Sequence, residues 1–99
     1  MKLYVIVDSA LSPGMAAAQA VHAAFAFALA WPDLTSQWQG SSNNIVVLQE
    51  ADLGARADAL EAEGLRLVRF HEPDLKDALT AICVEPEARR ALSSLRLAA

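Results

Sequence analysis

The chain has 99 residues and a single cysteine, Cys83. One cysteine excludes an internal disulfide bond and any zinc site built from several cysteines. It is compatible with a reducing compartment, so we expect a cytoplasmic protein. The two histidines and scattered carboxylates lack metal-ligand spacing, and the Gly-x-Gly-x-x-Gly pattern is absent. We therefore expect no metal and no cofactor. Cys83 lies between Ile82 and Val84, which favours an inert buried thiol over a nucleophile.

Basic residues are also scarce, with 8 Lys and Arg against 12 Asp and Glu and a net charge of −4. Domains that coat a phosphate backbone are normally basic, so the composition argues against an extended nucleic-acid surface. A small local patch is still compatible with it. Arg89, Arg90 and Arg96 against Glu87 give residues 86–99 a local charge of +2, which leaves −6 for the rest of the chain. These arginines suit either an acidic partner or a solvated helix end.

Charged residues are missing altogether from Ser9 to Pro32. A membrane-spanning helix needs about 20 predominantly apolar residues. Most of this run is alanine, however, and Gln19 and His22 interrupt it. Asp8 also falls where the apolar part of a signal peptide should begin. We therefore expect neither a membrane segment nor a secretory leader.

The remaining composition predicts one folded domain over residues 1–99. Hydrophobic residues make up 55% of the chain, which excludes a disordered protein. Scaling with chain length predicts about 5,500 Å² of folded surface, enough for one core and too little for two.

Apolar runs alternate with helical patterns along the chain. We expect strands at 3–7, 44–48, 65–70 and 79–84, and helices at 13–30, 53–64 and from 86 onward. Residues 33–42 suit a loop or short helical turn, and residues 71–78 suit a polar loop. The order βαβαββα predicts an α/β fold, a three-layer α/β/α sandwich with a four-stranded mixed sheet.

The first helix carries an unusual polar pair. On a helical wheel, Gln19 and His22 lie three residues apart at the edge of the apolar face. Val21, Phe25 and Leu29 are expected to face the sheet. The pair either lines a cleft near the end of a strand, or His22 is a core-edge histidine bonded to Gln19 or to a backbone carbonyl.

Residues 13–23, PGMAAAQAVHA, resemble the first-helix signature of type II peptidyl-tRNA hydrolases. In that signature a glycine precedes lysine, an aliphatic residue, Ala-Ala-Gln and His-Ala. Residues 80–86, TAICVEP, are similar to the family's threonine-led last strand and following proline, and the terminal leucines to its closing helix. The resemblance spans nearly the whole chain. It implies a small α/β/α sandwich that hydrolyses the ester between a peptide and the 3′ end of tRNA.

The resemblance implies catalytic roles for four residues: Gln19, His22, Glu72 and Thr80. The family's aspartate loop is shortened here, so Glu72 is the nearest match to that aspartate and Asp74 is the alternative. Such a carboxylate can orient or deprotonate an attacking water, while Gln19 and Thr80 can donate hydrogen bonds. Thr80 also suits a simple β-forming role.

The chain departs from the family where Met15 takes the place of a lysine. We assign substrate binding to Met15, Asp74, Lys76 and Arg89. Lys76 either replaces the missing cation in space or is a solvated loop charge. The alternative to an esterase is a non-catalytic member of the same fold that binds a protein, tRNA or small-molecule partner. A third interpretation is a small-molecule-binding homodimer that uses the alanine-rich helix as its interface.

Overall fold

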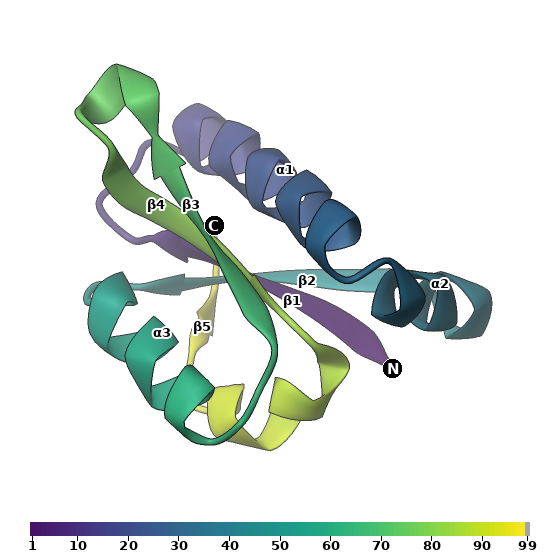
Figure 1. Ribbon diagram of the computed structural model, residues 1–99. Helices are drawn as coiled ribbons and strands as arrows, with labels where there is room; N and C mark the ends of the chain where they lie inside the picture. Colours follow the sequence, from purple (N-terminus) through teal and green to yellow (C-terminus); the bar gives the residue numbers. More distant parts are fainter. Residues whose placement is uncertain (99) are drawn as a thin grey trace.

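The computed structural model describes residues 1–98, so Ala99, the last residue of the predicted domain, lies outside the described residues. Its centre is a mixed sheet in the order β3-β4-β1-β2-β5 (Figure 1). The strands are β1 (Lys2–Asp8), β2 (Asn44–Glu50), β3 (Leu67–Glu72), β4 (Ala78–Val84) and β5 (Arg96–Leu97). The neighbours β1 and β2 are parallel, and the other neighbouring pairs are antiparallel. The α/β fold and mixed sheet are confirmed, but the sheet has five strands and not the four predicted.

Local sequence signals explain where the helices begin. Ahead of α1 (Pro13–Ala30), the Ser12 side chain accepts a hydrogen bond from the backbone nitrogen of Met15, and proline occupies the first helical position. Asp52 caps α3 (Leu53–Ala62) in the same way, as predicted.

The segment expected as a loop or short turn is a full helix, α2 (Pro32–Ser41). It begins at a second proline, and its Leu34 and Trp38 lie one turn apart and pack against the sheet. Packing of these two side chains outweighs the weak helix propensity of a Ser-, Gln- and Gly-rich stretch.

The C-terminal segment also differs from the prediction. The expected last helix is a 3₁₀-helix, η2 (Pro86–Leu92), and β5 follows it. Two consecutive serines favour a turn over another helical turn, and Leu97 then pairs with Leu48 of β2. The expected polar loop is mostly a tight hairpin, with η1 (Pro73–Leu75) between β3 and β4.

Helices cover both faces of the sheet and create two cores. One core packs α1 and α2 against the first face and includes Phe27, Val5 and Cys83. The other packs α3 and η2 against the second face and includes Leu60 and Ile82. The accessible surface is 5758 Å², close to the value expected from chain length.

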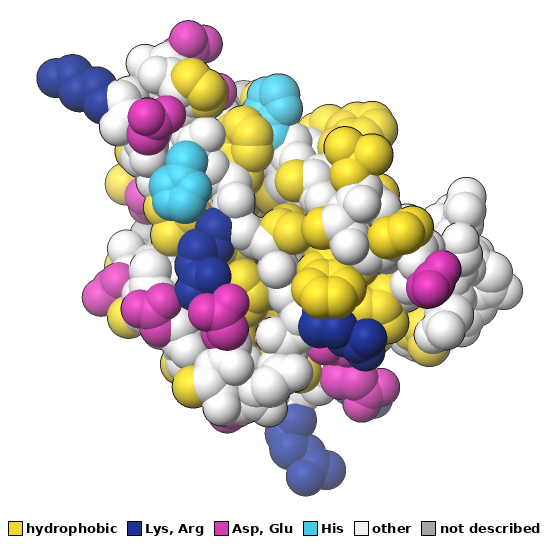
Figure 2. All heavy atoms as spheres, in the orientation of Figure 1, with side chains coloured by type: hydrophobic (Ala, Val, Ile, Leu, Met, Phe, Trp, Pro, Cys, Tyr) yellow, Lys and Arg dark blue, Asp and Glu magenta, His cyan; other side chains and the backbone are white. Residues whose placement is uncertain are grey.

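The predicted rotation of α1 is wrong. Val21, Phe25 and Leu29 are 54%, 69% and 85% exposed, whereas Ala23 and Phe27 are fully buried. Alanines occur on every face of this helix, so hydrophobicity alone does not select the face that packs against the sheet. Hydrophobic side chains consequently gather on the surface over α1 and its junction with α2 (Figure 2).

By length and composition, α1 is the one helix in the described part of the chain that could cross a membrane. A core helix of a soluble protein gives the same signal, and Phe27 of α1 lies in the core. The absence of a membrane segment stays a prediction.

Candidate active site

Three side chains from three elements form one chain of hydrogen bonds. Thr80 on β4 donates through Oγ1 to Oε1 of Gln19 on α1 at 2.6 Å. Gln19 donates through Nε2 to Oε1 of Glu72, the last residue of β3, at 3.0 Å. Figure 1 shows the first half of α1 beside the β3–β4 hairpin, where these residues meet. The fold thus brings together residues that lie 61 and 53 positions apart in the chain.

A β-bulge turns Thr80 toward α1. Phe70 pairs with Ala81 and His71 pairs with Leu79, so Thr80 is the extra residue on β4. Ala81 packs in the core under α1, whereas Ile82 and Leu79 pack on the opposite face. Regular alternation from Ala81 would place Thr80 on that opposite face, but a bulge lets two consecutive side chains share one face. The hydroxyl of Thr80 therefore reaches Gln19.

Gln19 is buried, with 1% of its surface exposed, and both ends of its amide are used. Its oxygen accepts from Thr80, and its nitrogen donates to Glu72 and, at 3.8 Å, to Sδ of Met15. A buried amide with these partners has little capacity left for a substrate. Gln19 therefore positions its neighbours.

Glu72 is the half-buried end of this chain. One carboxylate oxygen accepts from Gln19, and the other accepts from the backbone nitrogen of Asp74 at 3.5 Å. The second bond is long, so that oxygen is weakly engaged and can accept a proton or a water hydrogen bond. The backbone nitrogen of Asp77 donates to the carbonyl of Glu72 and closes the hairpin behind it.

His22 lies beside this chain without joining it. Its exposed ring stacks on Phe70, with centroids 4.8 Å apart and planes 13° from parallel. Phe70 precedes Glu72 by two residues on β3, so both side chains point to the α1 face. Within residues 1–98, His22 has no side-chain hydrogen bond to Gln19 or to a backbone carbonyl. Stacking on Phe70 holds it at the edge of the site.

The residues assigned to substrate binding separate into two groups. Met15 contacts Gln19, and Asp74 and Lys76 lie in the hairpin next to Glu72. Lys76 adopts a left-handed backbone conformation (φ 56°) and forms no salt bridge in the described part of the chain. Arg89 lies on η2, near the start of β1 and on the face of the sheet opposite to α1. The fold does not bring Arg89 to Glu72.

Cys83 is fully buried under α1. Burial raises the pKa of its thiol to about 12, so the thiol is protonated and a poor nucleophile at neutral pH. Among residues 1–98, no group of three His, Cys, Asp or Glu side chains is arranged to hold a metal ion. The site thus presents the carboxylate of Glu72, with the exposed imidazole of His22 on the neighbouring Phe70.

Two features of the site were missed in the sequence. Phe70 holds His22, and its spacing of two residues from Glu72 was a usable signal because alternate residues of a strand share a face. The bulge at Thr80 had no signal, since a one-residue register shift leaves no mark in composition or periodicity.

No protein-family model matches the chain, and no curated protein matches it in sequence.

Proposed function

We propose that this protein is a peptidyl-tRNA hydrolase-like esterase that cleaves the ester between a peptide and the 3′ end of tRNA. The observation that carries the proposal is the hydrogen-bond chain from Thr80 through Gln19 to Glu72. The resemblance assigns all three residues to an active site although they are distant in sequence. Helices on both faces of the mixed sheet are consistent with the family's α/β/α sandwich.

Glu72 is the general base in this proposal. Its weakly engaged oxygen takes a proton from a water molecule while the water oxygen attacks the ester carbonyl carbon. The bond between that carbon and the 3′ oxygen of the tRNA then breaks. The 3′ oxygen takes a proton and leaves as a hydroxyl, and the peptide leaves as a carboxylate.

We assign His22 to the leaving oxygen. Its stacked, exposed imidazole can donate a hydrogen bond or a proton toward a group bound beside Glu72. Gln19 and Thr80 are positioning residues. Thr80 holds the oxygen of Gln19, and this directs the amide nitrogen of Gln19 toward Glu72.

A non-catalytic member of the same fold is the second candidate. Met15 favours it, because a thioether stands where the family has a lysine, so the cation expected beside Gln19 is missing. Without that charge, an anionic transition state receives less electrostatic stabilisation. Such a protein would bind a protein, tRNA or small-molecule partner without turnover.

The deciding experiment measures release of the acyl group from a defined peptidyl-tRNA by the wild-type chain and by Glu72→Gln. We expect wild-type turnover and a loss of at least about 100-fold in the variant, the usual contribution of a general base. Asp77→Asn is the matched control, because it removes one carboxylate from the same hairpin and should keep activity.

The remaining outcomes separate the candidates. Binding of the peptidyl-tRNA without turnover would support the non-catalytic protein. Equal turnover in wild type and Glu72→Gln, with both folded by circular dichroism, would remove Glu72 from the mechanism. If the chain shows no turnover and does not bind the peptidyl-tRNA, both tRNA-directed functions are rejected.

A further inference from the structure

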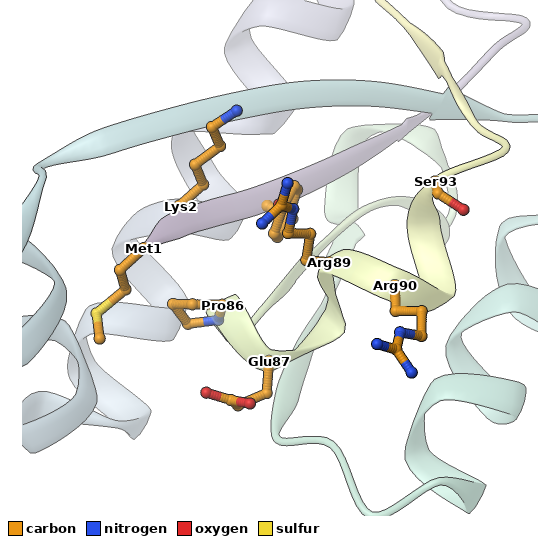
Figure 3. Close-up of a pocket in the computed structure, with 8 residues that line it drawn as sticks. Met1, Lys2, Pro86, Glu87, Arg89, Arg90 and Ser93 are labelled. Carbon is orange, nitrogen blue, oxygen red and sulfur yellow. The ribbon is translucent and has the colours of Figure 1, made fainter.

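A hollow lies at the opposite end of the molecule from Glu72. It occupies about 840 Å³ between the start of β1 and η2. Lys2 and Tyr4 contribute from β1, and Pro86, Arg89 and Arg90 contribute from η2 (Figure 3). Thr80 is six residues before Pro86 along extended chain, so about 20 Å separates the two places. They also lie on different faces of the sheet.

The charge of this pocket opposes that of the whole chain. Lys2, Arg89 and Arg90 line it together with one carboxylate, Glu87, which gives a local charge of +2 in a protein of net charge −4. Like charges gathered around a hollow repel one another, so the arrangement is favourable when an anion lies between them.

These cations also differ from three other arginines. Arg56, Arg66 and Arg69 each form a salt bridge with one or two carboxylates. In contrast, neither Arg89 nor Arg90 forms a salt bridge within the described residues, and both guanidinium groups keep their hydrogen-bond donors available. Glu87 is the one carboxylate that lines the pocket, and within the described residues it forms no salt bridge with either arginine.

The fold holds the pocket in place from both sides. Ala88 and Leu92 of η2 are buried in the core, and this anchors the intervening Arg89 and Arg90. Tyr4 is also buried and points to the same face of β1 as Lys2, two residues earlier. Figure 3 shows Arg89 extending from η2 toward β1, the strand that carries Lys2.

We propose that this pocket binds the phosphate group of a small phosphorylated molecule. The guanidinium group of Arg89, which extends toward β1, offers a planar donor pair that matches phosphate oxygens, and Lys2 and Arg90 add positive charge around it. Three cations and one carboxylate leave a charge of +2, which complements a phosphate monoester dianion. A single local charge of +2 in a protein of net charge −4 favours a small anion over the long backbone of a nucleic acid. The proposal is independent of the esterase activity.

The test follows amide resonances of the isotope-labelled chain during titration with adenosine monophosphate, inorganic phosphate and adenosine. We expect the first two to shift resonances of β1 and η2 saturably, and adenosine to leave them unchanged. The pocket variant, which combines Arg89→Gln and Arg90→Gln, should bind adenosine monophosphate at least about tenfold more weakly, because charge-assisted phosphate contacts are lost. Arg96→Gln is the control, because Arg96 is exposed and lies outside the pocket.

Three outcomes would overturn the proposal. The first is the absence of saturable shifts with either phosphate compound at millimolar concentration. The second is equal weakening by Arg96→Gln and by the pocket variant, which would indicate general charge attraction. The third is much tighter, pocket-dependent binding of a single-stranded RNA without terminal phosphates, which would identify an RNA backbone as the ligand.

Discussion

Gln19 shows how one buried side chain can position two residues from other elements. Its amide oxygen faces Thr80 and its amide nitrogen faces Glu72, so it fixes both neighbours at once. An amide is suited to this place because it donates and accepts, whereas a carboxylate there would repel Glu72. The residue type was visible in the sequence, but its buried position was not, because alanine surrounds it on the helix.

Replacing Thr80 by valine tests this arrangement at the level of one hydroxyl. Valine keeps the shape of the side chain and leaves the buried oxygen of Gln19 without a donor. We expect Thr80→Val to lower the free energy of unfolding by about 1–3 kcal/mol, the cost of an unsatisfied buried polar group. Urea denaturation monitored by circular dichroism measures the change.

Thr35→Val provides the comparison for that experiment. The Thr35 hydroxyl donates to the backbone carbonyl of Trp31, the N-cap residue of α2, a local contact of little value to stability. We expect its unfolding free energy to change by less than about 0.5 kcal/mol. Similar losses in both variants would contradict the role assigned to Thr80.

At the scale of elements, the sequence predicted the strands and helix starts that have a strong local pattern. Short β-branched runs identified β1 and β2, and side-chain caps identified the starts of α1 and α3. The fifth strand was missed because two residues carry no periodicity, and α2 was missed because tertiary packing overrides its composition. Which face of α1 meets the sheet depends on partners from β3 and β4 that no local pattern encodes.

Two phenylalanines on α1 provide a direct test of its rotation. Phe27 is fully buried and Phe25 is 69% exposed. We expect Phe27→Ala to lower the free energy of unfolding by about 3–5 kcal/mol, because it removes packing and leaves a cavity. Phe25→Ala should change it by less than about 0.5 kcal/mol. The reverse order in urea denaturation would favour the rotation predicted from the helical wheel.

The exposed stripe Val21, Phe25 and Leu29 also has a consequence for assembly, and we propose that it joins two copies of this chain. The α1 helix has no Asp, Glu, Lys or Arg, so two copies can meet there without opposing like charges, whereas the rest of the chain carries 12 acidic and 8 basic residues. We expect a dimer in light scattering and a monomer for Phe25→Ser with Leu29→Ser. Leu97→Ser removes an exposed leucine elsewhere and should leave the dimer intact. A wild-type monomer at high concentration would contradict the proposal.

At the scale of the whole molecule, one ion pair ties the start of β3 to the end of β4. Both carboxylate oxygens of Glu85 bond the guanidinium group of Arg66, and one of them also accepts from the Arg66 backbone nitrogen. Burial alone would raise the pKa of Glu85, but the hydrogen bonds and charge of Arg66 outweigh burial and lower this pKa. The charged carboxylate is therefore the form that favours folding.

The sign of the pH dependence follows from this lowered pKa. The stabilising contribution of Glu85 is complete above the ordinary pKa of a glutamate and is lost as the pH falls through the lower folded value. We expect Glu85→Gln to lower the free energy of unfolding at neutral pH by about 1–3 kcal/mol and to reduce its loss in acid. Urea denaturation at a series of acidic pH values measures both effects. Glu63→Gln, an exposed substitution, should retain the full acid dependence.

The two-residue strand β5 has a consequence for solubility. It covers β2 at Leu48 and Gln49, at the outer edge of the sheet. β2 contains the apolar β-branched run Ile45-Val46-Val47, and Ile45 is already 47% exposed. An open strand edge of this kind recruits strands from other chains and starts aggregation. β5 therefore protects part of the β2 edge from pairing with other chains. If β5 detached, the protein would keep its core but would tend to aggregate.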